Sequence, residues 1–376
     1  MDKIKIGIVG LQFGGEFPPI YRDHPDVEEV ILCDRDAELL NRYGNRFGFA
    51  RRFTRYDEML AESDIDAIHI VTPIHAHPEM TIRALNAGKH CACTVPMATT
   101  IDALRAIIDA RQRSGKRYMM METAVYTRHC LHVRHLIERN EIGNIQYMRG
   151  AHYQDDEGWP DYWKGLPPMH YATHAVAPLL ALSSTRATKV HCFGSGTMRE
   201  DLVRQYGNPY PIETAIFRLE RGHLAAEVSR SLFHTARDYV ECFTIFGDKK
   251  SFEWNVEKED PVLYELLPLE KGRRGREVVS TSITPPDYGF LLPKTIAKYT
   301  VQNTILDPEN PHMSLIQGGG HHGSHPHLVH EFVRSIVEDR KPWIDDITAA
   351  NWCAAGICAH ESALLDGQEV VVPAFV

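Results

Sequence analysis

The sequence predicts an α/β fold with two parts. The first is an N-terminal Rossmann unit with a doubly wound parallel sheet, and the second is a C-terminal α+β domain with a large, mostly antiparallel open sheet. Three observations lead to this prediction. Strand-like and helix-like segments alternate up to about residue 124, strand-like runs then follow one another with few helices between them, and 376 residues suffice for two hydrophobic cores.

The first element is a β-turn-α-β unit over residues 4–34, in which an apolar run, a glycine-rich turn and a second apolar run end on Asp34. Gly10 permits a tight turn, Gly15 permits close packing of helix on strand, and the amides between them can meet a pyrophosphate. Asp34 lies 24 residues after Gly10, near the offset of an acid that binds a ribose 2′-hydroxyl, which favours NAD over NADP. Gln12 replaces the usual middle glycine, so its side chain must turn away or touch the cofactor. The alternative is a glycine-rich turn in an α/β unit that binds no ligand. If the turn binds a dinucleotide, the expected cofactor residues are Gly10, Gln12, Phe13, Gly15, Asp34 and Arg35.

A second set of cofactor residues is expected where later strands of this domain end. Runs at 64–71, 90–93 and 118–121 are typical of buried parallel strands, with a helix at about 78–87. Ligands of such sheets bind beyond the carboxyl ends of the strands. Glu122 could orient a nicotinamide or substrate or act as an acid or base, and the alternative is an ion pair at a strand end. The candidates are Thr72, Pro73, His75, His77, Thr94, Val95, Pro96 and Glu122.

The second part of the chain reads as successive strands followed by helices. A stretch rich in Pro, Gly and charge, 271–320, is expected to be irregular. The strands are expected at 145–153, 188–193, 215–219, 223–229, 239–246 and 369–372, and the helices at 327–340 and 348–365.

Composition excludes several classes of function. The net charge of −9, without a long basic run, argues against nucleic acid as a partner. No apolar stretch is long enough to span a bilayer, and the chain opens into a strand rather than a signal peptide, so a cytoplasmic protein with no membrane partner is expected. The eight cysteines include no CxxC pair, which favours buried thiols over disulfides or a zinc ribbon.

Several motifs carry a resemblance to a known family. They are residues 7–15, Thr72-Pro73 with His75 and His77, Ala87-Gly88-Lys89-His90, Pro96-Met97-Ala98 and the segment around His174. On these motifs the chain resembles the Gfo/Idh/MocA family of nicotinamide-dependent sugar oxidoreductases over nearly its whole length. The resemblance implies an NAD-binding Rossmann domain at 1–124 and a substrate-binding and oligomerisation domain at 125–376. It also implies a homo-oligomer, a dimer or a tetramer.

Two positions depart from the family pattern. Members usually carry Glu-Lys-Pro, with the lysine as acid/base, and an Asp-x-x-x-His pair; here Val95 takes the place of the lysine and His170 that of the aspartate before His174. These departures resemble the branch of NAD-dependent glycosidases exemplified by α-N-acetylgalactosaminidases. Thr123 and Ala172 differ from that branch. Its counterparts here are Met119-Met120-Met121-Glu122 with Tyr126, Tyr171-Ala172-Thr173-His174 with Pro178, and Gly319-Gly320-His321-His322-Gly323.

The chemistry of alcohol oxidation requires a base, and Val95 cannot serve. His174 is the first candidate because an imidazole both accepts and returns a proton near neutral pH. Tyr153 could be a second acid/base or a packing residue. His170 and His174 are four residues apart and would share a helical face if the helix has begun by His170, which is also the spacing of a metal pair. Without an obvious third ligand, we favour two histidines that bind different sugar hydroxyls, and no metal.

Substrate contacts are expected from one aromatic and two histidine residues. Trp163 could lie against the apolar face of a pyranose ring or could plug an interface. His322 and His325 belong to a histidine-rich segment that follows three glycines, which suggests a loop shaped for close approach to a ligand, although some of its histidines could simply be exposed.

Three functions remain open from the sequence. The first is an NAD-dependent oxidoreductase that oxidises a ring hydroxyl, with C3 favoured, of a sugar or glycoside. The second is an NAD-recycling glycosidase that works by oxidation, elimination, addition of water and reduction. The third is a protein that senses a dinucleotide without catalysis.

Overall fold

The computed structural model describes residues 3–301 and 320–376, which form two compact units. The first unit contains Met1–Tyr126, Asp287–Ala350 and Phe375–Val376, and the second contains Thr127–Pro286 and Asn351–Ala374. The described residues of 287–301 and 320–350 thus pack with the N-terminal part of the chain. The division into an NAD-binding domain at 1–124 and a substrate-binding and oligomerisation domain at 125–376 stays a prediction.

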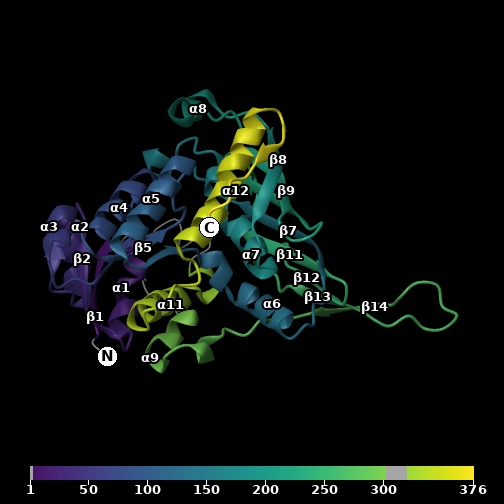
Figure 1. The fold of residues 1–376 in the computed structure, drawn as a ribbon, viewed down its shortest axis with the longest axis horizontal. Helices are drawn as coiled ribbons and strands as arrows, with labels where there is room; N and C mark the ends of the chain where they lie inside the picture. The colour runs from purple at the N-terminus through teal and green to yellow at the C-terminus, as the bar shows by residue number, and fades with distance from the viewer. Residues whose placement is uncertain (1–2, 302–319) are drawn as a thin grey trace. The chain divides into compact units, whose positions relative to one another are not determined.

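The first unit is built on a six-stranded parallel sheet in the order β3-β2-β1-β4-β5-β6. Figure 1 labels β1, β2 and β5 of this sheet. The strand order reverses between β1 and β4, which is the point where ligands of doubly wound sheets bind. The four central strands are almost wholly buried, as expected of a sheet covered by helices on both faces. The strands are β1 (Ile4–Val9), β2 (Val27–Cys33), β3 (Arg52–Phe53), β4 (Ala67–Ile70), β5 (His90–Thr94) and β6 (Tyr118–Met121).

Two helices of this unit begin and end at recognisable capping residues. The Asp36 carboxylate accepts hydrogen bonds from two amides of the first turn of α2, and Gly48 ends that helix in the left-handed conformation. The Thr100 hydroxyl accepts from one amide of the first turn of α5, which Gly115 ends in the same conformation. The helices are α1 (Pro18–Asp23), α2 (Ala37–Phe47), α3 (Tyr56–Ala61), α4 (His77–Asn86), α5 (Ile101–Ser114), α9 (Lys294–Ala297) and α11 (His325–Val337).

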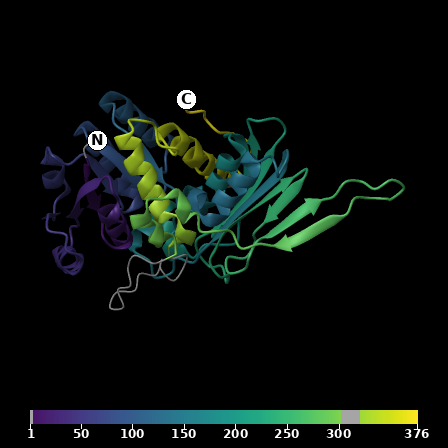
Figure 2. The same ribbon diagram turned by 90° about the horizontal axis from the view of Figure 1, so that it is seen from below.

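The second unit is built on a nine-stranded sheet in the order β14-β13-β12-β11-β7-β10-β9-β8-β15. All neighbouring strands are antiparallel except β7 and β10. Figure 2 shows β13 and β14, in green, as a long hairpin at one end of this sheet. The strands are β7 (Ile145–Tyr153), β8 (Ala187–Ser195), β9 (Ile212–Leu219), β10 (Ala225–Ser231), β11 (Val240–Gly247), β12 (Lys250–Glu253), β13 (Val262–Leu266), β14 (Val278–Ser282) and β15 (Val370–Val371).

One buried helix, α7 (Thr173–Ser183), covers the inner face of this sheet and packs on β7, β10 and β11. Its sequence is apolar all round, as expected of a helix buried on every side. Gly150 of β7 allows the close approach, because a Cβ atom there would lie 2.2 Å from the carbonyl oxygen of Ala175. The other helices are α6 (Arg128–Glu138), α8 (Glu200–Tyr206) and α12 (Asp346–Leu364), of which α12 begins in the first unit.

The predicted fold class is confirmed: a parallel Rossmann sheet is followed by a large, mostly antiparallel sheet. The segment 271–320, expected to be irregular, contains β14 and α9, because exposed residues 278–282 pair with β13 in the hairpin. Residues 302–319 of that segment lie outside the described residues. All eight cysteines are buried, as predicted. Among the described residues, no helix combines the length and apolar character needed to cross a membrane.

Candidate functional site

The glycine-rich turn after β1 leaves no room for side chains on its inner side. Gly10 has a φ of +92°, and a Cβ atom there would lie 2.1 Å from the Val71 carbonyl oxygen. At Gly14 a Cβ atom would lie 2.8 Å from the Cβ atom of Val71. Gly14 thus allows close packing against Val71, while the close packing expected at Gly15 stays a prediction. Gly15 is held by two hydrogen bonds: its amide donates to the Leu11 carbonyl at 3.1 Å, and its carbonyl accepts from the Tyr43 hydroxyl.

Asp34 at the end of β2 is tied to this turn. One carboxylate oxygen accepts a hydrogen bond from the Leu11 amide at 2.8 Å, and the other accepts from the Asp36 amide at 2.9 Å. The Gln12 side chain is exposed, so it does not fill the turn. Phe13 is half-buried and Arg35 is exposed. These residues fit the pyrophosphate and ribose of a dinucleotide, although the turn leads into a four-residue 3₁₀ helix, Phe13–Glu16, rather than directly into a long helix.

His77 links the two segments that follow β4 and β5. The His77 ring is buried, and its two nitrogens lie 2.8 Å from the carbonyl oxygens of Pro96 and Thr72. Burial lowers the pKa of His77, so this ring is neutral at pH 7. The Thr94 hydroxyl lies 3.5 Å from the same ring. Val95 is buried and has no proton to exchange.

The remaining predicted residues of these strand ends differ in exposure. His75 is exposed and Pro73 is half-buried. Glu122, directly after β6, is fully buried, and its carboxylate accepts a hydrogen bond from the Ala124 amide at 2.9 Å. Glu122 therefore lies at the carboxyl end of a strand, as predicted.

In the second unit, four polar side chains form a row across the inner face of the sheet. The strand register places Glu241, His152, Arg230 and Glu213 side by side on β11, β7, β10 and β9. Each is at most 4% exposed. The row therefore carries two carboxylates and a guanidinium out of contact with solvent, and such groups are costly unless they are paired and hydrogen-bonded.

Arg230 and Glu213 bind the chain that leads into α7. Arg230 donates to the carbonyl oxygen of Tyr171 at 3.1 Å, and Glu213 accepts from the Met169 amide at 2.8 Å. Glu213 also lies 2.6 Å from Nδ1 of His360. Burial lowers the pKa of Arg230 to about 10, so it remains charged at pH 7. The buried charges thus fix the position of residues 169–171 and of the helix that follows.

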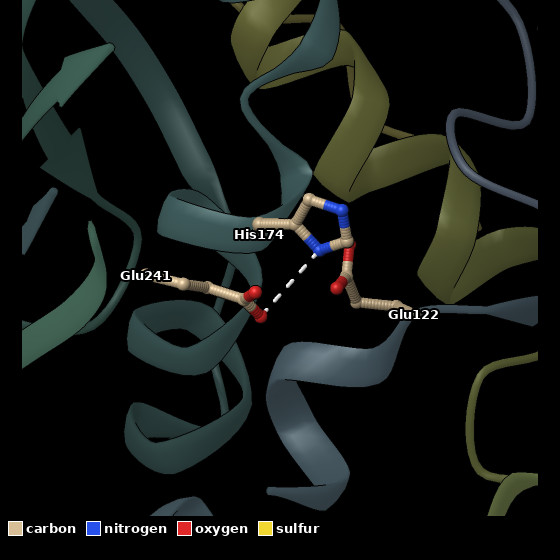
Figure 3. Close-up of side chains that lie close together, drawn as sticks. All are labelled: Glu122, His174 and Glu241. Atoms are coloured by element: carbon tan, nitrogen blue, oxygen red, sulfur yellow. Dashed lines mark ion pairs between the residues drawn. The ribbon is translucent and has the colours of Figure 1, made fainter. Parts of the chain in front are cut away.

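His174, the second residue of α7, lies beside Glu241 of this row. Nδ1 of the imidazole is 3.7 Å from the nearer Glu241 oxygen (Figure 3). The other Glu241 oxygen accepts a hydrogen bond from the Tyr239 hydroxyl at 2.6 Å. Nε2 of His174 lies 3.4 Å from the Tyr171 hydroxyl, and the His152 ring is 5.0 Å away between centroids. A carboxylate in this position can hold the imidazole in one orientation and stabilise its protonated form.

Two of the predicted catalytic residues are placed differently. His170 lies in a 3₁₀ helix, Pro168–Tyr171, that ends before α7 begins at Thr173, so the condition for a shared helical face with His174 is not met. Its ring packs against His360 at 4.8 Å, and burial lowers its pKa to about 3. Tyr153 alternates with His152 along β7 and therefore faces the opposite side of the sheet. Within either unit taken alone, the described residues gather no set of three metal-ligating side chains.

The sequence analysis missed the polar row that ends beside His174. Glu241, His152, Arg230 and Glu213 lie far apart along the chain, and only the register of four strands brings them together. The available signal was a charged or polar residue inside each of four apolar strands, at positions where alternation predicts burial.

The predicted substrate residues lie in both units. Trp163 is buried and packs edge-to-face on Tyr171 at 4.9 Å in the second unit. His322 and His325 belong to the first unit, where His322 is half-buried. His325 is buried, and Nδ1 of its ring lies 2.9 Å from the Glu16 carboxylate, so one ring nitrogen already has a partner within the protein. Of the glycines before this segment, Gly318 and Gly319 lie outside the described residues.

Comparison with known proteins identifies the first unit. Residues 4–122 match the family described as "Oxidoreductase family, NAD-binding Rossmann fold". The glycine turn, Asp34 and the six parallel strands all lie within this match. NAD is therefore the cofactor that this part of the chain is built to bind.

Two relatives and one solved structure extend the comparison. A glycosyl hydrolase family 109 protein of Phocaeicola vulgatus is 26% identical over 230 residues, covering 55% of this chain and 49% of that protein. The chain thus spans about half the length of that relative. Levoglucosan dehydrogenase of Pseudarthrobacter phenanthrenivorans is 24% identical over 390 residues, covering 92% of this chain and 98% of that one. A solved structure of levoglucosan dehydrogenase with NADH has the same fold, with a TM-score of 0.77, 21% identity and 100% of both chains covered.

Proposed function

Because residues 4–122 belong to the Gfo/Idh/MocA family of NAD-binding oxidoreductases, we propose that the protein oxidises a ring hydroxyl of a sugar or glycoside with NAD. The observation that carries this proposal is the buried His174 with the Glu241 carboxylate 3.7 Å from its ring. The full-length similarity to levoglucosan dehydrogenase supports a carbohydrate as the substrate class.

NAD would accept a hydride from the carbinol carbon, and the residues of the first unit would hold it. Asp34 would accept a hydrogen bond from a ribose hydroxyl, while its contact with Leu11 keeps the turn in shape. The amides at Gly10–Gly15 would meet the pyrophosphate. A 2′-phosphate would repel the Asp34 carboxylate, which favours NAD over NADP.

His174 would take the hydroxyl proton as the carbonyl forms. Val95 stands where a lysine is usual, and its side chain is apolar and buried, so the proton needs another acceptor. Glu241 would stabilise the resulting imidazolium, and the Tyr171 hydroxyl at 3.4 Å offers a path for the proton to leave. We propose C3 as the oxidised position, because a ketone there acidifies the C2–H bond next to the glycosidic carbon, as the elimination described below requires.

The direct experiment gives purified protein NAD and a panel of sugars and aryl glycosides, and follows NADH by absorbance. A dehydrogenase accumulates NADH in proportion to the sugar consumed. His174→Ala should lower kcat by at least ~10²-fold, the usual contribution of a general base, with the Kd for NAD unchanged. Tyr153→Phe is the matched control, since Tyr153 faces the other side of the sheet. A near-normal rate in His174→Ala would remove this residue from the mechanism.

A second candidate function is an NAD-recycling glycosidase, which the similarity to glycosyl hydrolase family 109 favours. Oxidation at C3 would let the glycosidic group leave by elimination, water would add, and the same reduced cofactor would return the ketone to an alcohol. In the panel above, this enzyme would free the aryl alcohol without lasting NADH. Binding of NAD without either signal would favour the third possibility, a dinucleotide sensor.

We also propose that the protein forms a homo-oligomer through the outer face of the second sheet. Phe193, Ile216 and Val371 are 57%, 46% and 72% exposed there, on the neighbouring strands β8, β9 and β15. Exposed apolar side chains on adjacent strands are typical of an interface. Light scattering would measure the molar mass, and Phe193→Glu should shift it toward that of a monomer.

A further inference from the structure

Asp156, three residues beyond β7, is a buried carboxylate that the proposed reaction does not use. Its side chain is 3% exposed, and neither carboxylate oxygen has a hydrogen-bond partner among the described residues. Its backbone is fixed, because its amide donates to the Leu232 carbonyl at 2.8 Å and its carbonyl accepts from the Trp159 amide at 3.0 Å. A buried carboxylate without hydrogen bonds destabilises the folded state. Such a group therefore indicates a bound ligand or another specific role.

The positive charge that acts on Asp156 belongs to Arg230 of the polar row, which lies two residues before Leu232, the acceptor of the Asp156 amide. Four of the five N–H groups of Arg230 are accounted for by the carbonyl oxygens of Tyr171, His152 and Ser231 and by the amide oxygen of Gln154. One N–H on Nη2 has no acceptor among the described residues. The guanidinium also lies 5.4 Å from the centroid of the Tyr171 ring. An unsatisfied donor and an unsatisfied carboxylate therefore belong to the same buried neighbourhood of the second unit.

The titration of Asp156 fits this environment. Burial raises its pKa to about 7, which the positive charge of Arg230 opposes and the neighbouring Asp155 carboxylate reinforces. These two are the charged groups that act on Asp156. The carboxyl group is thus divided between its acid and its ionised form at pH 7.

We propose that Asp156 and Arg230 bind hydroxyl groups of the carbohydrate: hydroxyls donate to the Asp156 oxygens, and one accepts from the remaining N–H of Arg230. A polyol satisfies both groups at once, because each hydroxyl is a donor and an acceptor. The carbohydrate class rests on the function proposed above. Asp156 is then a residue for binding and specificity, distinct from the proton-transfer role of His174.

The binding experiment uses calorimetry with NADH-saturated protein, in which no oxidation of the sugar takes place. The probes are D-glucose, D-galactose, N-acetylgalactosamine and levoglucosan, measured at pH 7 in phosphate and in Tris. Hydroxyl donors favour the ionised carboxylate, so binding should release about half a proton per sugar. Asp156→Asn should bind about 10- to 100-fold more weakly and release no proton.

Asp155→Asn is the matched control, because Asp155 is half-buried and its carboxylate accepts only a local hydrogen bond from the Glu157 amide. It should keep the affinity of the unmodified protein and release a smaller fraction of a proton, because the Asp155 charge contributes to the raised pKa of Asp156. Unchanged affinity and proton release in Asp156→Asn would overturn the proposal, as would sugar binding without proton release in the unmodified protein. The latter measurement stands even if the variant fails to fold.

The two proposals fail in different ways. Sugar binding with Asp156-dependent proton release, but no turnover with NAD, would leave this inference standing and contradict the proposed reaction. Turnover that persists with the same KM in Asp156→Asn would support the reaction and reject Asp156 as a binding residue. A deoxy sugar that loses affinity in the unmodified protein but not in Asp156→Asn would identify the hydroxyl that is bound.

Discussion

The carboxylate beside His174 comes from an unexpected part of the chain. The resemblance to the family suggests a carboxylate four residues before the histidine, where this chain has His170. In the structure Glu241 of β11 lies beside the imidazole instead, and Tyr239 holds it in place through a 2.6 Å hydrogen bond. A carboxylate can act on an imidazole from any element that brings it within reach, so the pair is defined by geometry rather than by sequence spacing.

Removing the charge of Glu241 should therefore slow the reaction without changing the fold. We expect Glu241→Gln to lower kcat by about 10²- to 10⁴-fold, because an amide stabilises the imidazolium poorly and can hold the wrong tautomer. The KM for the sugar and the Kd for NAD should change little. Glu227→Gln is the control, since Glu227 lies on the same sheet but bonds to Tyr147 on its outer side. Steady-state kinetics of both variants would test this, and equal rates would contradict the role of Glu241.

Asp34 governs the choice of dinucleotide at the residue scale. We expect Asp34→Ala to weaken NAD binding by about 10- to 100-fold, because it removes hydrogen bonds to a charged acceptor and the tie to Leu11. NADP binding should weaken less, since the repulsion of the 2′-phosphate is also removed. Fluorescence titration with NADH and NADPH would measure both affinities. Equal weakening of the two would reject the assignment of Asp34 to the ribose.

At the scale of elements, two sets of contacts on the inner face of the sheet position α7. Its first residues follow the segment 169–171, which Arg230 and Glu213 hold. Further along the helix, Gly150 lets the helix backbone approach β7. Because His174 is the second residue of α7, any shift of this helix moves the imidazole away from Glu241.

Gly150→Ala tests this placement. The added Cβ atom would lie 2.2 Å from the Ala175 carbonyl oxygen, and helix and strand must separate to admit it. We expect a loss of about 1–3 kcal/mol in the free energy of unfolding and a lower kcat. Gly289→Ala is the control, because the nearest atom there is 3.3 Å away. Urea unfolding of both variants would measure the difference, and equal stability would show that α7 tolerates displacement.

At the scale of the molecule, site residues within one short sequence segment could be predicted better than residues that strand pairing brings together. The glycine turn, Asp34 and the strand ends around Thr72 and Pro96 could be located because each lies within a short βαβ segment. His174 was located by its motif. The row of Glu241, His152, Arg230 and Glu213 could not be predicted, because a shift of one residue in any strand pairing would have placed a side chain on the other face.

The two units should differ in their response to acid. In the first unit, burial lowers the pKa of His24 and of His327 to about 4 and that of His69 to about 3. Below pH 6.5 these histidines bind protons in the unfolded chain but stay neutral in the folded one. The free energy of unfolding therefore falls from about pH 6.5 down to pH 4. Each such histidine contributes a slope of about 1.4 kcal/mol per pH unit. In the second unit, His170 acts in the same direction, but Asp156 acts in the opposite one, because its folded pKa of about 7 lies above its unfolded value.

We therefore expect the first unit to open before the second as the pH falls from 6.5 to 4.5. Hydrogen exchange with mass spectrometry, corrected for the intrinsic pH dependence of exchange, would compare peptides of β1 and β4 with peptides of β7 and β10. His69→Leu should reduce the pH dependence of the first unit by about 1.4 kcal/mol per pH unit, because it removes the titration of one buried histidine. Asparagine in place of the exposed His135 should leave it unchanged. Earlier opening of β7 and β10 would contradict this account, since it would mean that groups other than these buried histidines control acid unfolding.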